Sequence, residues 1–167
     1  MPVKKLDPWY VTGLVEGEGC FTYSRSGSRL ALYFAVKLTG ADDTLLEALQ
    51  RFFGGAGTLY RIRPRAPTAR AGATKAASYY RVCRREQLRK ILEHFDAYPL
   101  RGVKAASYRI WRLMALLRLE FPKTSQDRLD LFAAQLSAAA PKRAVSSAAE
   151  EGAAARKDQP PDRDSSA

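Results

Sequence analysis

The sequence predicts an α+β domain in which helices cover one face of a four-stranded antiparallel sheet. Three observations predict this class: segments of alternating apolar residues come in pairs, Gly, Pro and Ser bound these segments, and segments of helical period stand between and after the pairs. No apolar run approaches the ~20 residues of a membrane-spanning helix. The first residues lack the apolar stretch of a secretory signal, so we expect an intracellular protein without membrane contact.

The first half of the domain is predicted to fold as helix, strand, strand and helix. Asp7 can cap the first helix, Pro8 fits its first position, and the helix continues to Glu18 and stops at Gly19. Strict alternation over 29–37 predicts a strand with one core-facing side. The other elements of this half are a strand over 20–25, a turn at 26–28 and a helix over 44–53.

The second half repeats the two strands and adds three helices. Pro64 ends a strand that begins at Thr58, and a basic loop over 65–75 follows. The remaining elements are a strand over 78–84 and helices over 85–95, 108–119 and 126–136. His94 is expected near the end of a surface helix, without a role. The side chains interpreted as core rather than as base-stacking groups are Phe21, Tyr23, Tyr80, Trp111 and Met114.

The positive charge is concentrated in residues 1–137, which we interpret as one domain. Lys and Arg total 28 against 17 Asp and Glu, a net charge of +11. Residues 138–167 are rich in Ala, Ser and Pro, carry no net charge and are predicted to be a disordered tail. A domain so basic favours a polyanionic partner, nucleic acid above all, over a merely solvated basic face. Two cysteines and one histidine exclude a disulfide scaffold, a four-thiolate zinc site and a His-rich metal site.

The first predicted helix has two unusual features. Gly13 and Gly17 share one face, although a helical glycine costs about 1 kcal/mol relative to alanine, which suggests that another backbone comes close there. Glu16 and Glu18 lie at the C-terminal end, where the helix dipole disfavours anions and free carbonyl groups add oxygen ligands for a hard cation. For Glu16 alone, a structural hydrogen-bonding role is the favoured interpretation.

Residues 11–19, Val-Thr-Gly-Leu-Val-Glu-Gly-Glu-Gly, followed by Cys20-Phe21, resemble the LAGLIDADG motif of homing endonucleases. The predicted αββαββα order and the segment from Tyr98-Pro99-Leu100 through Lys104 to Trp111 are similar to that family as well. The resemblance covers about Trp9 to Leu119. It implies an intron-encoded, metal-dependent endonuclease that cuts both strands of a long pseudo-palindromic DNA duplex.

The resemblance also implies roles for single residues. Glu18 is expected to be the catalytic acid and a metal ligand, Gly17 to help hold Mg²⁺ through its carbonyl group, and Glu16 to be structural. Lys104 resembles the basic residue near the cleavage site, although an ordinary helix-start lysine is an alternative and Arg101 lies three residues away. One chain supplies too few acids for a complete site, which favours a homodimer. The residues expected at the dimer interface are Trp9, Thr12, Gly13, Glu16 and Gly17.

The face of the sheet opposite the helices is expected to bind the DNA major groove. By alternation, its base-contacting candidates are Thr22, Ser24, Arg29, Tyr33, Lys37 and Arg81. In the third strand, Leu59 should face the core, which directs Tyr60 to the groove and leaves Arg61 and Arg63 inward unless a bulge or an early strand end reverses them. All three are kept as DNA-binding candidates. Arg65, Arg70 and Lys75 of the loop are expected to contact phosphates.

A second hypothesis is an RNA maturase acting on its intron RNA, or a non-cleaving nucleic-acid-binding protein, on the same fold. The family often has a Gln in the segment that matches residues 38–43, and this chain has none, which favours the alternative slightly. Glu18 and Lys104 favour the nuclease. Frequent Arg and the Ala-rich tail suggest a GC-rich genome and favour a bacterial cytoplasm over an organelle.

Overall fold

The computed structural model describes residues 5–40, 43–67, 72–73, 75–121, 123 and 126–140. The predicted order of helices and strands is confirmed. The elements are α1 (Pro8–Glu18), β1 (Gly19–Ser26), β2 (Arg29–Thr39), α2 (Asp43–Phe52), β3 (Thr58–Ile62), β4 (Ala77–Val82), α3 (Arg85–Ala97), α4 (Lys104–Glu120) and α5 (Gln126–Ala139).

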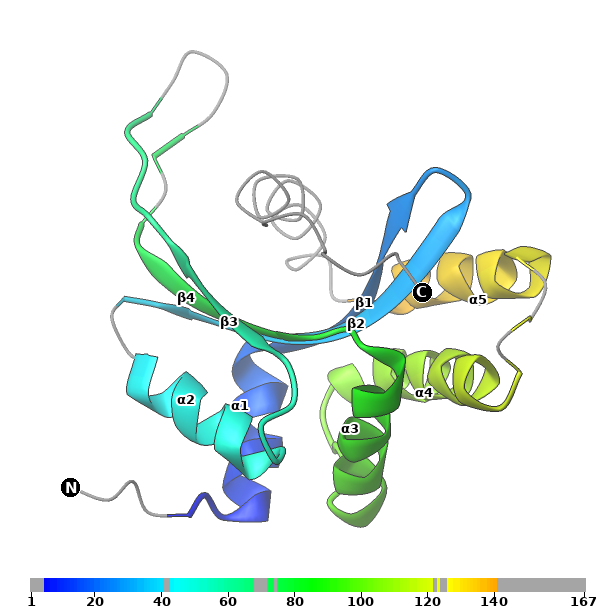
Figure 1. The fold of residues 1–167 in the computed structure, drawn as a ribbon, viewed down its shortest axis with the longest axis horizontal. Coiled ribbons are helices and arrows are strands. Elements are labelled where there is room, and N and C mark those ends of the chain that lie inside the picture. The colour runs from blue at the N-terminus through cyan, green and yellow to red at the C-terminus, as the bar shows by residue number, and fades with distance from the viewer. Residues whose placement is uncertain are drawn as a thin grey trace, which may run out of the picture.

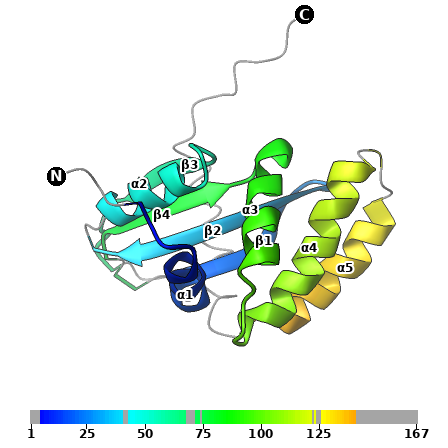
Figure 2. The same ribbon diagram turned by 90° about the horizontal axis from the view of Figure 1, so that it is seen from below.

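The four strands form one antiparallel sheet in the order β1-β2-β4-β3. Figure 1 shows this sheet as a saddle, with α1 to α4 below it and α5 beside α4 at the end of the β1–β2 hairpin. Seen from below, the helices lie across the sheet, and α1 is viewed nearly end-on (Figure 2). The helix-free face is concave, and both hairpins rise around it. The predicted α+β architecture is therefore confirmed. Among the described helices, none combines the length and apolar composition that crossing a membrane requires.

Helix α1 leads directly into β1. Asp7 caps the helix as predicted, because its Oδ1 accepts hydrogen bonds from the backbone N–H groups of Trp9 (2.9 Å) and Tyr10 (3.2 Å). At the other end, a Cβ on Gly19 would lie 2.5 Å from Cγ1 of Val15, so only glycine allows this junction. The C-terminal end of α1 is thereby fixed at the start of the edge strand.

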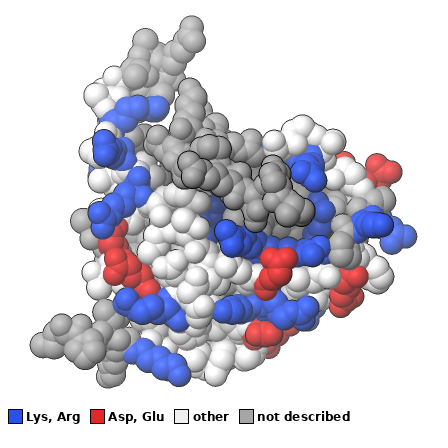
Figure 3. Space-filling model, viewed as in Figure 1, with Lys and Arg blue, Asp and Glu red and all other residues white. Residues whose placement is uncertain are grey.

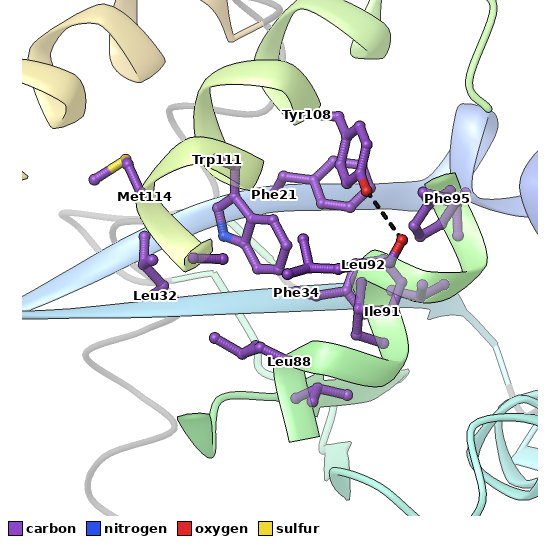
Figure 4. Packing of buried hydrophobic residues seen from close by; sticks show 14 of the residues in the cluster. Phe21, Leu32, Phe34, Leu88, Ile91, Leu92, Phe95, Tyr108, Trp111 and Met114 are labelled. Atoms are coloured by element: carbon purple, nitrogen blue, oxygen red, sulfur yellow. Dashed lines mark hydrogen bonds between the residues drawn. The ribbon is translucent and has the colours of Figure 1, made fainter. Parts of the chain in front are cut away.

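The core lies between the sheet and the helices, where a cluster of aromatic rings packs among aliphatic side chains (Figure 4). The ring of Phe21 is 4.9 Å from that of Tyr108 and 5.4 Å from that of Trp111, centroid to centroid. The Trp111 Nε1–H donates to the carbonyl of Thr22 at 3.1 Å, so even the indole nitrogen is satisfied. Burying each such side chain stabilises the fold by about 1.5–3 kcal/mol. The predicted core residues are confirmed, with Tyr23 only partly buried against the cluster.

The structure corrects two element boundaries and one placement. Helix α4 begins at Lys104, four residues before the predicted start, because residues 105–107 are small helix-compatible residues without apolar period. Helix α5 extends to Ala139, past the predicted start of the tail at 138; the rest of that prediction, from residue 141, lies outside the described residues. His94 is buried, not superficial, because it shares with Ile91 the core-facing side of α3.

Candidate active site and nucleic-acid interface

The last turn of α1 presents a carboxylate next to the main-chain carbonyl groups of the helix end. Gly17 and Glu18 are exposed, and β1 begins directly after them. Both groups are hard oxygen donors of the kind that Mg²⁺ prefers, so the donor set fits the metal that the sequence predicts. Within the described part of the chain, no three His, Cys, Asp or Glu side chains gather to hold a metal ion. Within one copy, Glu18 is therefore not part of such a cluster.

Lys104 reaches the same turn from the far end of the sequence. It is the first residue of α4, and its Nζ donates to the carbonyl oxygens of Val15 (3.1 Å) and Gly17 (2.8 Å). A positive charge at the C-terminal end of α1 is favoured by the helix dipole. Burial lowers the pKa of this amine, while the neighbouring Cys20, Glu18 and Glu16 act to raise it. The amine is thus held at the end of α1, beside the predicted metal ligands.

Glu16 binds the loop that precedes α4. Its Oε1 accepts hydrogen bonds from the backbone N–H groups of Arg101 (2.6 Å) and Gly102 (2.7 Å), between α3 and α4. The guanidinium group of Arg101 lies 5.0 Å from the ring of Trp9. The sequence favoured a structural role for Glu16, and these contacts agree, although the partners are distant in sequence rather than local.

The outer face of α1 is open. Trp9 is 46% exposed and Tyr10 is 50% exposed. A Cβ built on Gly13 or Gly17 would meet no atom within 4 Å, so nothing in the described part of the chain requires glycine there. Thr12, by contrast, is only 5% exposed and donates from Oγ1 to the Tyr98 carbonyl at 3.0 Å, so within one copy it bonds inward, and its place at the dimer interface stays a prediction.

A hollow of about 350 Å³ indents the surface beside this helix face. The residues that line it are Trp9, Thr12, Gly13, Glu16, Pro99 and Arg101.

The concave face of the sheet carries most of the predicted base-contacting residues. The strand register places on this face Thr22, Ser24, Arg29, Tyr33, Lys37, Tyr60 and Arg81. The guanidinium group of Arg81 lies 4.0 Å from the ring centroid of Tyr33, and its Nη2 donates to Oγ of Ser24 at 3.5 Å. Tyr33 is only 4% exposed, which corrects the prediction that it is an accessible outer side chain. It supports Arg81 instead.

Arg61 lies on the other face of the sheet. It pairs in register with Ser78, and its Nη2 is 2.6 Å from Oδ2 of Asp43, at the start of α2. The Ser78 hydroxyl donates to Oδ1 of the same carboxylate. The alternation of β3 is therefore regular, and Arg61 points to the helix side, as alternation predicts. The bulge that would direct it toward the groove is not formed in this strand. Arg63, Arg65 and Lys75 are exposed beyond the strand ends, and Arg70 lies outside the described residues.

Tyr79 is a concave-face residue that the sequence analysis missed. It stands in register between Lys37 and Tyr60, with its ring 6.3 Å from that of Tyr60. The core position of Tyr80 already implied that its neighbour points outward, so alternation could have found it. Burial raises the pKa of Tyr79, which keeps the hydroxyl protonated.

The surface charge follows the shape of the sheet. On the side seen in Figure 3, Lys and Arg side chains extend up the β3–β4 arm and reappear on the opposite side of the molecule. The acidic side chains seen there are set among them, mostly lower on the molecule. A basic rim of this kind favours contact with phosphates.

Residues 11–115 match the family model described as LAGLIDADG endonuclease. The chain belongs to this family. A curated relative, the "Uncharacterized 50.9 kDa protein in ND4 intron 1" of Podospora anserina, is 34% identical over 125 residues, which are 70% of this chain and 25% of that protein. The "Probable intron-encoded endonuclease 3" of Neurospora crassa is 30% identical over 115 residues, 65% of this chain and 20% of that protein.

Solved structures of LAGLIDADG proteins share the fold. The I-SmaMI LAGLIDADG homing endonuclease bound to cleaved DNA is 29% identical, with a TM-score of 0.66, over 98% of this chain and 52% of that one. The LAGLIDADG meganuclease I-AabMI bound to uncleaved DNA has a TM-score of 0.64 over 78% of this chain and 43% of that one, and at 23% identity it supports the fold alone. The chain thus spans a quarter or less of the two curated relatives and about half of these LAGLIDADG structures.

The comparisons overturn one prediction from composition. The curated relatives are intron-encoded proteins of fungi, and they point to an organelle rather than to a bacterial cytoplasm. Frequent Arg and an Ala-rich tail reflect nucleotide composition, which is not specific to one kind of genome.

Proposed function

We propose that this chain is the DNA-cleaving domain of an intron-encoded, site-specific endonuclease that acts as a homodimer on a long pseudo-palindromic duplex. The observation that carries the proposal is the meeting of Glu18 and Lys104 at the end of α1, below a concave sheet face with basic and hydroxyl side chains. A pure DNA-binding protein has no need of an exposed carboxylate against the helix dipole.

In the proposed reaction, Glu18 and the Gly17 carbonyl would hold Mg²⁺. When bound, the metal would supply polarisation of the phosphate and activation of water. The Lys104 ammonium lies where it can stabilise the negative charge that develops on the phosphate. The concave face positions the duplex, and the exposed Arg63, Arg65 and Lys75 contact its backbone.

The homodimer supplies the second carboxylate. The open face of α1 allows the backbones of two such helices to approach across Gly13 and Gly17, with the exposed Trp9 and Tyr10 at the rim. Two copies related by a two-fold axis then bring two Glu18 side chains together, and the symmetry explains a pseudo-palindromic target.

The test joins the two DNA flanks of the reading frame into an intron-less duplex and incubates it with the protein and Mg²⁺. We expect a double-strand cut near the junction that EDTA prevents. Glu18→Gln should abolish the cut and leave the dissociation constant for DNA unchanged. Loss of DNA binding in this variant would show that Glu18 supports the fold and is not the catalytic acid.

The second candidate is a maturase or a non-cleaving binding protein. The segment over 38–43 lacks the Gln that family members often carry. Among its described residues before α2, Thr39 has a polar side chain that could take the place of that Gln. Salt-sensitive DNA binding without cleavage, together with binding of the intron transcript, would favour this candidate.

A further inference from the structure

Helix α4 begins without a cap of its own. Its N-cap residue is Val103, which offers no side-chain hydrogen bond, and Lys104 is the first helical residue. Lysine has a flexible four-carbon side chain, so the direction of its amine depends on how firmly the backbone at the helix start is held. Within α4, the Ser107 hydroxyl donates to the Lys104 carbonyl at 3.0 Å, but the backbone N–H groups before the helix start are held from outside α4.

The support comes from α1. The Glu16 carboxylate accepts hydrogen bonds from the backbone N–H groups of Arg101 and Gly102, which lie just before the helix start. Lys104 then returns to the same turn of α1, because its Nζ donates to the carbonyl groups on either side of Glu16, at Val15 and Gly17. These two sets of hydrogen bonds, one from each side, hold the end of α1 and the start of α4 together.

Gly102 shows that the fit is close. A Cβ on this residue would lie 2.6 Å from Oε2 and 3.1 Å from Cδ of Glu16, and the three nearest atoms all belong to that one carboxylate. The Glu16 carboxylate therefore occupies the space that a side chain at position 102 would take.

We propose that Glu16 is a positioning residue, which holds the start of α4 so that the Lys104 amine is fixed at the carbonyl end of α1 beside Glu18. This inference rests on the proposed function insofar as Lys104 assists cleavage. The placement of the amine can be measured without cleavage, so the two claims can fail separately.

The first experiment measures single-turnover cleavage and DNA affinity for Glu16→Ala, Glu16→Gln and Lys104→Ala. Glu16→Ala should lower the cleavage rate by at least about tenfold, with the dissociation constant for DNA unchanged, because misplacing a catalytic group affects the reaction step. Glu16→Gln should recover part of the rate, since its amide oxygen accepts the same two N–H groups. Glu93→Ala, which removes an exposed carboxylate from α3, is the matched control and should cleave normally.

Two double variants separate positioning from a general loss of structure. Adding Glu16→Ala to Lys104→Ala should cause no further loss of rate, because Glu16 acts through Lys104. Gly102→Ala should be harmful alone and harmless in the Glu16→Ala background, where the carboxylate no longer meets the new Cβ. Equal losses from Gly102→Ala in both backgrounds, or multiplicative losses in the first pair, would overturn the proposal.

The second experiment does not depend on nuclease activity. NMR of ¹⁵N-labelled lysine side chains reports the solvent exchange of the Lys104 ammonium protons, with Lys104→Arg used to assign the signal. Exchange should be at least about tenfold faster in Glu16→Ala than in the wild-type and Glu93→Ala proteins, because the two carbonyl contacts are lost. Unchanged exchange overturns the positioning role even if cleavage falls, and normal cleavage by Lys104→Ala instead refutes the catalytic role of Lys104.

Discussion

Oγ1 of Thr12 lies 3.3 Å from Nε2 of His94, a residue 82 positions away in the sequence. The hydroxyl group donates its one proton to the Tyr98 carbonyl, so it accepts from His94, which is therefore the neutral tautomer with a proton on Nε2. This buried chain of hydrogen bonds joins α1 to α3. Rings of Phe52, Phe53 and Phe95 contact the imidazole and exclude water from it.

Thr12→Val should destabilise the protein. The substitution keeps the shape of the side chain but leaves the His94 N–H and the Tyr98 carbonyl without their partner, at a cost of about 1–3 kcal/mol. Urea unfolding measures this loss. Thr58→Val, at an exposed position of β3, is the matched control and should change the free energy of unfolding very little. Equal stability of the two variants would mean that the hydrogen bonds contribute nothing.

Stability should fall on mild acidification because of His94. Burial lowers its pKa from an ordinary 6.5 to about 4, so the unfolded chain binds a proton between these values while the folded protein does not. The contribution of His94 is therefore complete above pH 6.5 and is lost as the pH falls toward 4, by at most about 3 kcal/mol. In urea unfolding at several pH values, His94→Gln should flatten this slope. Asp96 and Asp130, whose pKa values Arg112 and Arg25 hold below the ordinary range, contribute only at lower pH.

Two arginines on opposite faces of the sheet should differ in DNA binding. Arg81→Ala should weaken specific binding by about 1–3 kcal/mol, since the side chain lies on the concave face over Tyr33. Arg61→Ala should leave DNA affinity almost unchanged, because this residue pairs with Asp43 on the helix side. Fluorescence anisotropy with labelled target DNA at fixed salt compares the two variants, which remove the same charge. Equal effects would show that total charge, and not the face of the sheet, governs binding.

Gly13→Leu should separate association from folding. The new side chain points into open space within one copy, so the fold itself has no reason to be destabilised. Two α1 helices could no longer approach there, and sedimentation should show monomers at concentrations where the wild-type protein is dimeric. Cleavage should be lost in parallel. A dimer that persists would place the interface elsewhere.

Gly19→Ala is the contrasting glycine variant. Its Cβ would meet Cγ1 of Val15 at 2.5 Å and main-chain atoms of the same residue at about 3 Å, so overpacking should lower stability by about 1–3 kcal/mol. Thermal unfolding checks this, and a stability equal to that of Gly13→Ala would contradict it.

The order of the elements could be predicted because each segment has a clear period and clear ends, as Asp7-Pro8 at the start of α1 and Gly19 at its end illustrate. The burial of Tyr33 and of His94 could not be predicted, because it depends on which distant strand or helix packs against each residue. For Arg61, alternation predicted the inward side correctly, but the sequence alone could not exclude a bulge that would have reversed it.

The candidate site was predictable in part. Glu18 and Lys104 could be named from their motifs, but the sequence contains no sign that Lys104 contacts the Gly17 carbonyl or that Glu16 binds Arg101 and Gly102. Contacts between residues more than 80 positions apart arise only when α4 docks against α1.

Helix α1 passes into β1 at Gly19 without a connecting residue, so the helix and the strand are directly coupled. Glu18 is the last residue of α1, and the concave-face residues Thr22 and Ser24 follow in β1. Under the proposed function, the hairpin that contacts the DNA and the carboxylate that acts on it therefore lie on one continuous stretch of backbone. A duplex bound out of register along β1 would then present a displaced phosphate to Glu18, so the fit of the target and its cleavage are linked through the backbone.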